Sequence, residues 1–537
     1  MAAEDAPAQR PNIIVILVDD MGFSDIDCYG SEISTPNLSR MARGGVVFRR
    51  MYNCARCCPT RASLLTGLYP HQAGIGAMVN ELPWPEYQGY LNDRCVTIAE
   101  ALGSAGYRTF MSGKWHVGGG YNVQKPETWS PGDAKHPTPN QRGFEEHFGT
   151  LCGAGSYWYP PTLTRNGEFV KPENEEFYLT DAIAAHASEM IGRACESTPD
   201  QPFFSYVAFT APHWPLHAPQ ADIERYRGRY AGGWDAVRTA RHEELKGSGI
   251  LDPKWPISPR DPEVPAWEDI PDKDYQDALM ATYAAMLHRV DAGIGQILQT
   301  LEDRGIAEDT LVLFLSDNGG CHEFIQYESS WASRLQRRTL DGEDVTVGNA
   351  PGLMPGPDTT YQSYNRPWAN ASNTPFRLHK HWVHEGGIAT PLIAHWPGRI
   401  KQGRQTDRLS HVVDIMATCL DAAGVNYPAE YDGKPITPPA GESFLPTLDG
   451  AEQDTSDRLL FWEHEGNLAV RHGRWKLVQQ WEKRRWELYD MAEDRTELND
   501  LSARKDDEVR RLDGLWSEWA DAIGVVPREQ IIAGWQK

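Results

Sequence analysis

Two pairs of polar residues follow apolar runs in this chain, and both pairs could bind a metal ion. Asp19 and Asp20 come directly after NIIVILV, and Asp317 and Asn318 come directly after LVLFLS. Runs of this kind, rich in branched apolar residues, are typical of strands that are buried on both faces. Carboxylate and amide oxygens suit a hard divalent cation such as Ca²⁺ or Mg²⁺ better than zinc. Since Asp after a strand is also ordinary turn chemistry, the prediction depends on the two pairs occurring together.

The segment CARCCPTRASLLTG, which begins at Cys54, contains a second group of reactive side chains. A zinc or redox role for its CxxC pair is disfavoured, because the chain has no second CxxC and no Cys/His set with zinc-site spacing. Pro59 is typical of a first helical turn and places Cys57 at the helix N-terminus, where free N–H groups favour negative charge. Arg61 follows four residues later, on the same helix face. A nucleophile beside a guanidinium predicts a site for an anionic ester.

Buried strands and helices alternate along most of the chain. The apolar runs predict strands at Asn12–Val18, Phe203–Phe209, Leu311–Ser316 and Pro391–His395. Helical patterns occupy Val96–Ala105, Tyr178–Cys195, Ala278–Arg304 and His411–Ala423. The alternation predicts an α/β fold with a mainly parallel central sheet sandwiched by helices. Because ligands of such sheets bind beyond the carboxyl ends of the strands, we expect both polar pairs at one edge of the sheet.

Other stretches have different patterns. Residues 212–275 and 325–375 are rich in turn formers and are predicted to be long loops that wall the site. From Leu459 onward, LLFWEHEG, LAVRHG, RWKLVQQW and RRWELYD predict four antiparallel strands, and a helix follows at about Asp506–Ala522. We therefore expect a main domain that carries the site over residues 1–430. A smaller C-terminal α+β domain, a four-stranded antiparallel sheet plus a helix, is expected over residues 431–537.

The composition excludes some classes of partner. The 537 residues include 52 Lys and Arg against 75 Asp and Glu, a formal net charge of −23, so we expect no nucleic acid and no membrane as partner. No apolar run approaches the roughly 20 residues of a membrane span. The start has no pattern of a secretion signal, and the nine cysteines show no disulfide framework. These features predict a cytoplasmic protein, with the periplasm as the alternative.

The motif C-x-P-x-R at Cys57, followed by LLTG, resembles the signature of type I sulfatases of the alkaline phosphatase superfamily. GYRTFMSGKWH at Gly106–His116 resembles a second signature of that family, and the resemblance extends from about residue 11 to 501. It implies an alkaline-phosphatase-like core and the oxidation of Cys57 to formylglycine by a separate formylglycine-generating enzyme. Two positions depart from the usual pattern outside the motif core: Thr60 replaces the commoner serine, and Arg56 replaces a small or apolar residue.

The resemblance also assigns roles to individual residues. It implies one Ca²⁺ held by Asp19, Asp20, Cys57, Asp317 and Asn318. It implies a catalytic set made of Cys57, Arg61, Lys114, His116, His213 and Lys380. In that set Lys114 and His116 flank the formylglycine, His213 faces the leaving oxygen of the ester, and Lys380 binds sulfate.

The implied activity is the hydrolysis of a small-molecule sulfate monoester, an aryl or alkyl sulfate, to an alcohol or phenol and inorganic sulfate. The nucleophile is the hydrated, gem-diol form of formylglycine, and Ca²⁺ and the cationic side chains neutralise the ester. Two alternatives stay open. One is a phosphonate monoester or phosphodiester hydrolase of the same superfamily. The other is a non-catalytic binder of sulfated ligands in which Cys57 remains a thiol.

Overall fold

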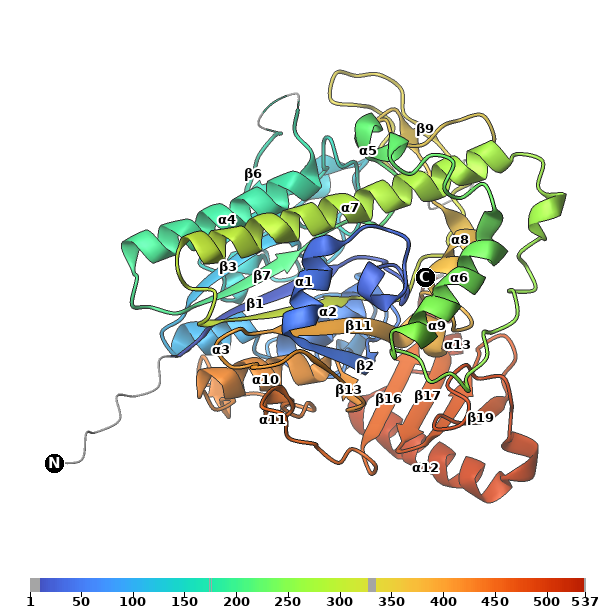
Figure 1. Cartoon of the computed structure of the whole chain (residues 1–537). Helices are drawn as coiled ribbons and strands as arrows, with labels where there is room; N and C mark the ends of the chain where they lie inside the picture. Colours follow the sequence, from blue (N-terminus) through green and yellow to red (C-terminus); the bar gives the residue numbers. More distant parts are fainter. Residues whose placement is uncertain (1–9, 173, 175, 327–334, 536–537) are drawn as a thin grey trace.

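Strand β1 (Asn12–Val18) lies inside the central sheet of the computed structural model, which describes residues 10–172, 174, 176–326 and 335–535. Helices cover both faces of this sheet (Figure 1), and the side chains of β1 alternate between two apolar cores. Ile14, Ile16 and Val18 pack with helices α4 (Leu179–Ser197) and α7 (Lys273–Asp303). The intervening residues of β1 pack with α2 (Cys57–Thr66), α3 (Ile98–Ser104) and α10 (Val413–Ala423) on the opposite face. The expected α/β sandwich is therefore confirmed.

Eleven strands of the described residues form the central sheet, in the order β12-β2-β11-β8-β1-β7-β3-β4-β5-β6 with β13 beside β2. The strands other than β1 are β2 (Val46–Tyr52), β3 (Arg108–Lys114), β4 (Glu146–Thr150), β5 (Leu163–Arg165), β6 (Glu168–Phe169), β7 (Phe203–Ala208), β8 (Thr310–Ser316), β11 (Ala389–His395), β12 (Arg404–Thr406) and β13 (Ser410–His411). β1, β3, β4, β7 and β8 run parallel, whereas β11 is antiparallel to both β2 and β8. The sheet is thus mainly parallel, as predicted, although β2, β3, β4, β5, β6, β12 and β13 were not expected.

The prediction of a long loop over residues 212–275 is wrong. This region contains α5 (Gln220–Glu224), α6 (Gly233–Gly247) and the start of α7. The buried face of α6 includes Arg238 and Arg241 beside Trp234 and Leu245, so an apolar periodicity is hard to recognise. Arg241 NH1 lies 2.6 Å from Asp25 Oδ1, which compensates the buried charge.

The predicted loop over residues 325–375 is wrong in part. Residues 327–334 lie outside the described residues. The remainder contains two short strands and a helix, namely β9 (Thr346–Val347), β10 (Thr360–Tyr361) and α8 (Asn365–Ser372). The other short elements are α1 (Pro36–Gly44), α9 (Glu385–Ile388), β14 (Glu430–Tyr431), β15 (Lys434–Pro435) and α11 (Leu445–Leu448).

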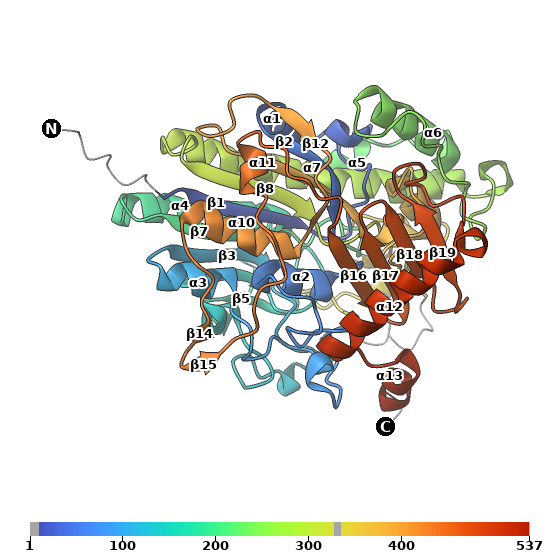
Figure 2. The ribbon, with the colours of Figure 1, turned by 90° about the horizontal axis from the view of Figure 1, so that it is seen from below.

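The predicted C-terminal sheet is confirmed (Figure 2). Its antiparallel strands, in the order β16-β17-β18-β19, are β16 (Leu459–His464), β17 (Asn467–His472), β18 (Trp475–Gln479) and β19 (Trp486–Asp490). Helix α12 (Asp506–Ile523) covers one face through Leu512, which packs with Val470, Leu477 and Leu488. The opposite face contributes Ala469 and other residues to the core that β1 shares with α7. A final helix, α13 (Arg528–Trp535), follows; the domain boundary at residue 430 stays a prediction.

Candidate active site

The ends of β1 and β8 bring the two polar pairs together. These strands are parallel neighbours in which Val18 pairs with Ser316, so the residues that follow them meet at one edge of the sheet. Asp20 has a φ of 67°, a left-handed conformation that aspartate tolerates better than most residues. Its N–H donates to Asp317 Oδ1 at 3.2 Å, and Asn318 Nδ2 donates to Asp20 Oδ1 at 2.7 Å.

Three cationic side chains from other elements contact these carboxylates. Arg61 NH2, from α2, lies 2.8 Å from Asp317 Oδ2, and Lys114, from the end of β3, pairs with Asp19. Lys380 Nζ lies 2.7 Å from Asp20 Oδ1. We call this group the strand-end cluster; it consists of Asp19, Asp20, Asp317, Asn318, Arg61, Lys114 and Lys380. Its three carboxylates and three cations balance, so by itself the cluster offers no net positive charge to an anion.

The strand-end cluster has the features of a divalent-cation site. Asp19 Oδ1 and Asn318 Oδ1 are fully buried, and neither has a hydrogen-bond partner among the described residues. An unpaired buried acceptor costs about 1–3 kcal/mol, so two of them in one cluster indicate that a partner is missing. Burial and the neighbouring charge of Asp317 raise the pKa of Asp19 to about 7, which shows that the carboxylate needs more positive charge than it has. These oxygen ligands fit Ca²⁺.

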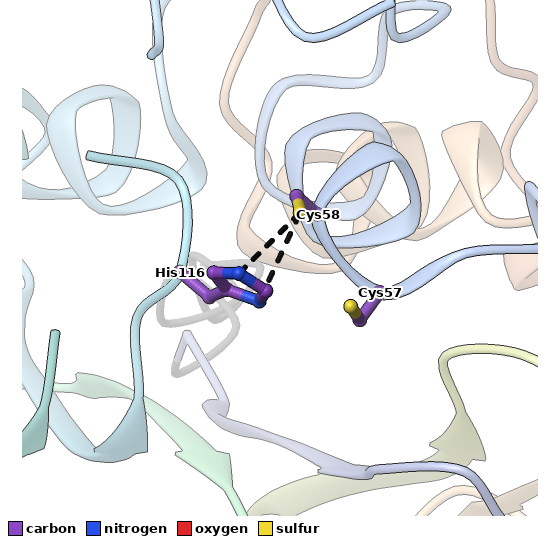
Figure 3. A group of neighbouring side chains, drawn as sticks. All are labelled: Cys57, Cys58 and His116. Atoms are coloured by element: carbon purple, nitrogen blue, oxygen red, sulfur yellow. Dashed lines mark hydrogen bonds between the residues drawn. The ribbon is translucent and has the colours of Figure 1, made fainter. Parts of the chain in front are cut away.

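Cys57 is the first residue of α2 and so lies at the helix end where free N–H groups and the helix dipole favour negative charge. Its thiol is 2% exposed. The neighbouring thiol of Cys58 and the charge of Lys114 outweigh burial and hold the pKa of Cys57 well below its usual value. His116 Nε2 lies 3.6 Å from Cys58 Sγ (Figure 3), and burial lowers the pKa of His116 to about 4. The helix start therefore favours an anionic nucleophile beside a neutral imidazole.

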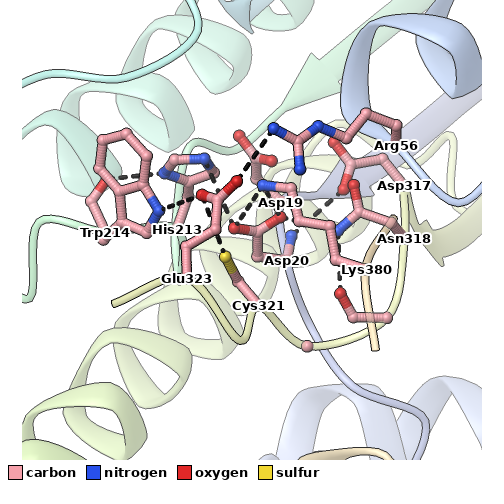
Figure 4. A network of polar contacts seen from close by, with 12 residues as sticks. Asp19, Asp20, Arg56, His213, Trp214, Asp317, Asn318, Cys321, Glu323 and Lys380 are labelled. Atoms are coloured by element: carbon pink, nitrogen blue, oxygen red, sulfur yellow. Dashed lines mark hydrogen bonds and ion pairs between the residues drawn. The ribbon is translucent and has the colours of Figure 1, made fainter. Parts of the chain in front are cut away.

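His213 follows β7 and faces the cluster from the opposite side (Figure 4). Its Nδ1 donates to the carbonyl of Trp214 at 2.7 Å, which fixes the ring. Its Nε2 lies 3.4 Å from Asp20 Oδ2. Burial lowers the pKa of His213, while the charge of Asp20 opposes this effect. Since the carbonyl can only accept, Nε2 carries a proton only when the ring is cationic.

A pocket of about 720 Å³ opens above these residues. Cys57, His116, His213 and Lys380 line it. Arg61, Lys114 and the four strand-end oxygen donors do not line the pocket and are completely buried. The structure thus brings all the predicted site residues together in two layers, four facing the pocket and the rest behind them.

Three pocket-lining residues that are linked through Glu323 were not assigned a role by sequence reasoning. Glu323, six residues after Asp317, lies with its Oε1 2.9 Å from Arg56 NH2. Trp214 Nε1 donates to Glu323 Oε2 at 2.8 Å. The position of Glu323 beyond the end of a buried strand was the available signal, because the same rule identified Asp317. Arg56 was noted only as a departure from the usual motif.

Comparisons with known proteins agree with this geometry. The family model described as Sulfatase matches residues 11–425, and the model described as N-sulphoglucosamine sulphohydrolase, C-terminal, matches residues 376–513. The chain is 34% identical over 463 residues to an arylsulfatase of Klebsiella aerogenes, covering 82% of this chain and 92% of that protein. It is 32% identical over 554 residues to an uncharacterized sulfatase of Schizosaccharomyces pombe, covering 97% and 96%.

Solved structures share the fold at lower identity. The structure of Ps i-CgsB in complex with k-i-k-neocarrahexaose has a TM-score of 0.66 and 23% identity, covering 95% of this chain and 93% of that one. The phosphonate monoester hydrolase of Agrobacterium radiobacter has a TM-score of 0.57 and 21% identity, covering 96% and 95%. At these identities the likeness shows the fold alone, and the expected fold class is confirmed.

Proposed function

The chain belongs to the sulfatase family and is a sulfuric ester hydrolase, and from this premise we propose that it hydrolyses small aryl or alkyl sulfate monoesters with Ca²⁺ and a formylglycine derived from Cys57. The observation that carries the proposal is the strand-end cluster with its two unpaired oxygens, Asp19 Oδ1 and Asn318 Oδ1. Because the side-chain charges of the cluster cancel, a divalent cation would give this region a net charge of +2. A sulfate ester is an anion, so that excess would draw it toward Cys57.

Asp19, Asp20, Asp317 and Asn318 would hold the Ca²⁺, which supplies positive charge to an ester in the pocket. Formylglycine at position 57 would supply an oxygen nucleophile at the start of α2. Other side chains of the site position the ester, the carboxylates and the proton acceptor. Lys380 reaches the pocket while bound to Asp20, and Arg61 and Lys114 hold the carboxylates in place from behind. His116, kept neutral by burial, can accept a proton beside residue 57.

His213 is proposed to protonate the leaving oxygen from Nε2, the nitrogen that faces Asp20. A nitrophenolate leaves without a proton, whereas an alkoxide needs one. The expected result for His213→Ala is therefore a steeper dependence of kcat/KM on the leaving-group pKa across a series of phenyl sulfates. Parallel dependences in the two proteins would mean that His213 only binds the sulfate group.

A mass spectrum of the peptide that spans Cys57 tests the proposal most directly. Protein made together with a formylglycine-generating enzyme should carry formylglycine at this position and release sulfate from an aryl sulfate. Cys57→Ala should fold and lose nearly all activity, whereas Cys54→Ala, which removes another buried thiol of the same segment, should retain it. Fully active protein with an unmodified thiol at position 57 would refute the formylglycine proposal. Faster turnover of an aryl phosphonate than of the matched aryl sulfate would favour the phosphonate hydrolase alternative.

We also propose a cytoplasmic location, with the periplasm as the alternative. All nine cysteines are free thiols, which supports a reducing compartment. Within the described part of the chain, the helices are too short or too polar to cross a bilayer. Fractionation of the source cells with markers for both compartments tests this proposal, and recovery with the periplasmic marker would contradict it.

A further inference from the structure

An ion pair between Arg56 and Glu323 forms part of the pocket wall next to Cys57 (Figure 4). Arg56 NH2 lies 2.9 Å from Glu323 Oε1, and the two side chains are 18% and 23% exposed. Arg56 is the N-cap residue of α2, directly before Cys57. The backbone therefore places the Arg56 side chain next to Cys57 in the lining of the pocket.

Hydrogen bonds to the second carboxylate oxygen of Glu323, the one that does not contact Arg56, hold this side chain in place. Its Oε2 accepts hydrogen bonds from Trp214 Nε1 at 2.8 Å and from Cys321 Sγ at 3.4 Å. Burial raises the pKa of Glu323, but the charges of Arg56 and Lys380 outweigh this effect and hold it well below the usual value. The pair is therefore a carboxylate and a guanidinium at neutral pH, with no net charge, and the carboxylate is not free to turn away.

The pair retains hydrogen-bonding capacity that the residues described in the structure do not use. The guanidinium of Arg56 makes one other contact, from Nε to the sulfur of Met78 at 3.4 Å, and its NH1 donates no hydrogen bond within the described residues. Among the described residues, Glu323 Oε1 contacts Arg56 alone, and it can accept a further hydrogen bond. A donor and an acceptor thus lie side by side in the pocket wall. A hydroxyl group, which both accepts and donates, matches this arrangement, whereas a second anion would meet the charge of Glu323.

We propose that Arg56 and Glu323 are specificity-determining residues that bind a hydroxyl group on the alcohol part of the sulfate ester. This inference rests on the proposed function and narrows its substrate class to sulfate esters whose alcohol part carries a second, free hydroxyl. Trp214 and Tyr361 also line the pocket and provide flat apolar surfaces for the carbon skeleton that carries the hydroxyl. A hydroxyl-free ester would leave the polar atoms of the pair partly desolvated and unpaired, which disfavours its transition state.

The test compares phenyl sulfate with 2-hydroxyphenyl and 3-hydroxyphenyl sulfate, which differ from it by one hydroxyl group. The wild-type protein should show a higher kcat/KM for at least one hydroxyphenyl ester than for phenyl sulfate. Hydrogen bonds to charged groups are lost at a cost of roughly 10- to 100-fold in affinity, so this preference should fall by about that factor in Arg56→Met and in Glu323→Gln. Arg56→Lys keeps the charge but loses the fork of donors, and its preference should be intermediate.

The matched control is Arg338→Met, which removes an arginine from another ion pair, with Asp344 at 3.1 Å, outside the pocket lining. Its preference should equal that of the wild type. The inference is wrong if the wild type shows no preference for a hydroxyphenyl ester, or if the preference survives in both Arg56→Met and Glu323→Gln. In either case, release of sulfate by the wild type would still support the proposed function. If the wild type, with formylglycine and Ca²⁺ verified, releases no sulfate from any of the three esters, the proposed function is wrong and the inference falls with it.

Discussion

Two buried clusters of charged side chains in this molecule differ in how completely their oxygens are paired. One is the strand-end cluster beneath the pocket. The other, which we call the junction cluster, lies where the C-terminal sheet meets β2 and consists of Glu385, Lys476, Arg495, Glu497 and Tyr52. Both clusters bury several ionised groups, and both join elements that are far apart in the sequence.

The junction cluster pairs both oxygens of its central carboxylate. Lys476 Nζ lies 2.9 Å from Glu385 Oε1, and Arg495 Nε and the Tyr52 hydroxyl donate to Glu385 Oε2 at 3.0 and 2.8 Å. Although burial raises the pKa of Glu385, the two cations outweigh it and lower the pKa to about 2. In the strand-end cluster the pKa of Asp19 moves the other way, to about 7.

The difference separates a structural use of buried charge from a binding use. A carboxylate whose two oxygens both have partners needs no ligand, and its ion pairs hold the two sheets together. A carboxylate that burial leaves underpaired stores unfavourable free energy, which a bound cation can relieve. The same residue types therefore stabilise the fold in one place and create a site in the other. The following predictions test this distinction.

The largest effect is expected in the junction cluster. Glu385→Gln removes the charge that Lys476 and Arg495 neutralise, and breaking a buried ion pair in this way costs about 3–5 kcal/mol. The free energy of unfolding, measured by urea denaturation, should fall by that amount. The kcat/KM of the folded variant for an aryl sulfate should stay within about threefold of the wild type. A large loss of kcat/KM without a loss of stability would show that this cluster, too, serves the reaction.

The converse result is expected for Asp19→Asn. Asparagine resembles the protonated acid, and the raised pKa of Asp19 makes that form about as populated as the carboxylate at pH 7 when metal is absent. In EGTA at pH 7 the free energy of unfolding should therefore rise rather than fall, because burial disfavours the ionised Asp19 of the wild type and the neutral asparagine avoids that cost. Loss of a charged cation ligand should lower kcat/KM by about 10²–10³-fold, as for other electrostatic groups of active sites. Equal activity of Asp19→Asn and the wild type would remove Asp19 from the site.

A smaller effect is expected from Ca²⁺ itself. A ligand at a hundredfold excess over its Kd stabilises the state that binds it by about 2.7 kcal/mol. The free energy of unfolding should be higher by this amount in Ca²⁺ than in EGTA, both for the wild type and for Glu385→Gln. This increase should be absent from Asp19→Asn, because that variant lacks a ligand of the strand-end cluster. Equal stabilisation of all three proteins would place the cation elsewhere.

The contrast between the clusters also explains what could be predicted from the sequence. The strand-end cluster was predictable because its oxygen donors follow two apolar strands of the kind that parallel sheets bury, and because Cys57 and Lys114 lie in recognisable motifs. The junction cluster was not, since Glu385, Lys476 and Arg495 are single charged residues in unrelated segments. Nothing local distinguishes them from solvated charges, and only the packing of the two sheets brings them together.

The same reasoning accounts for the errors in the fold. Helix α6 was missed because Arg238 and Arg241 occupy its buried face, where an apolar residue gives the helical signal. Arg56 and Glu323 were not assigned a role because their pairing depends on two loops meeting over the pocket. Patterns within one element were therefore predictable, and ion pairs between elements were not.

The two clusters should also show pH dependences of stability that are opposite in sign. Asp19 has a pKa of 3.8 in the unfolded chain and about 7 in the folded, metal-free protein. Its folded form binds the proton more tightly, so its contribution to stability is fully present below pH 3.8 and is lost as the pH rises through about 7. Glu385 has an unfolded pKa of 4.5 and a folded pKa of about 2, so its contribution is present above pH 4.5 and is lost as the pH falls toward 2.

Urea denaturation in EGTA at several pH values, for the wild type and each variant, measures both contributions. The stability of the wild type relative to Asp19→Asn should fall between about pH 4 and 7, whereas its stability relative to Glu385→Gln should rise as the pH approaches 4.5 from below. Saturating Ca²⁺ should abolish the first dependence and leave the second unchanged, because the cation keeps Asp19 ionised and does not contact the junction cluster. If the pH dependence of stability has the same sign relative to both variants, the distinction between a paired and an underpaired cluster is wrong. Burial and neighbouring charge would then shift the pKa of both carboxylates in the same direction.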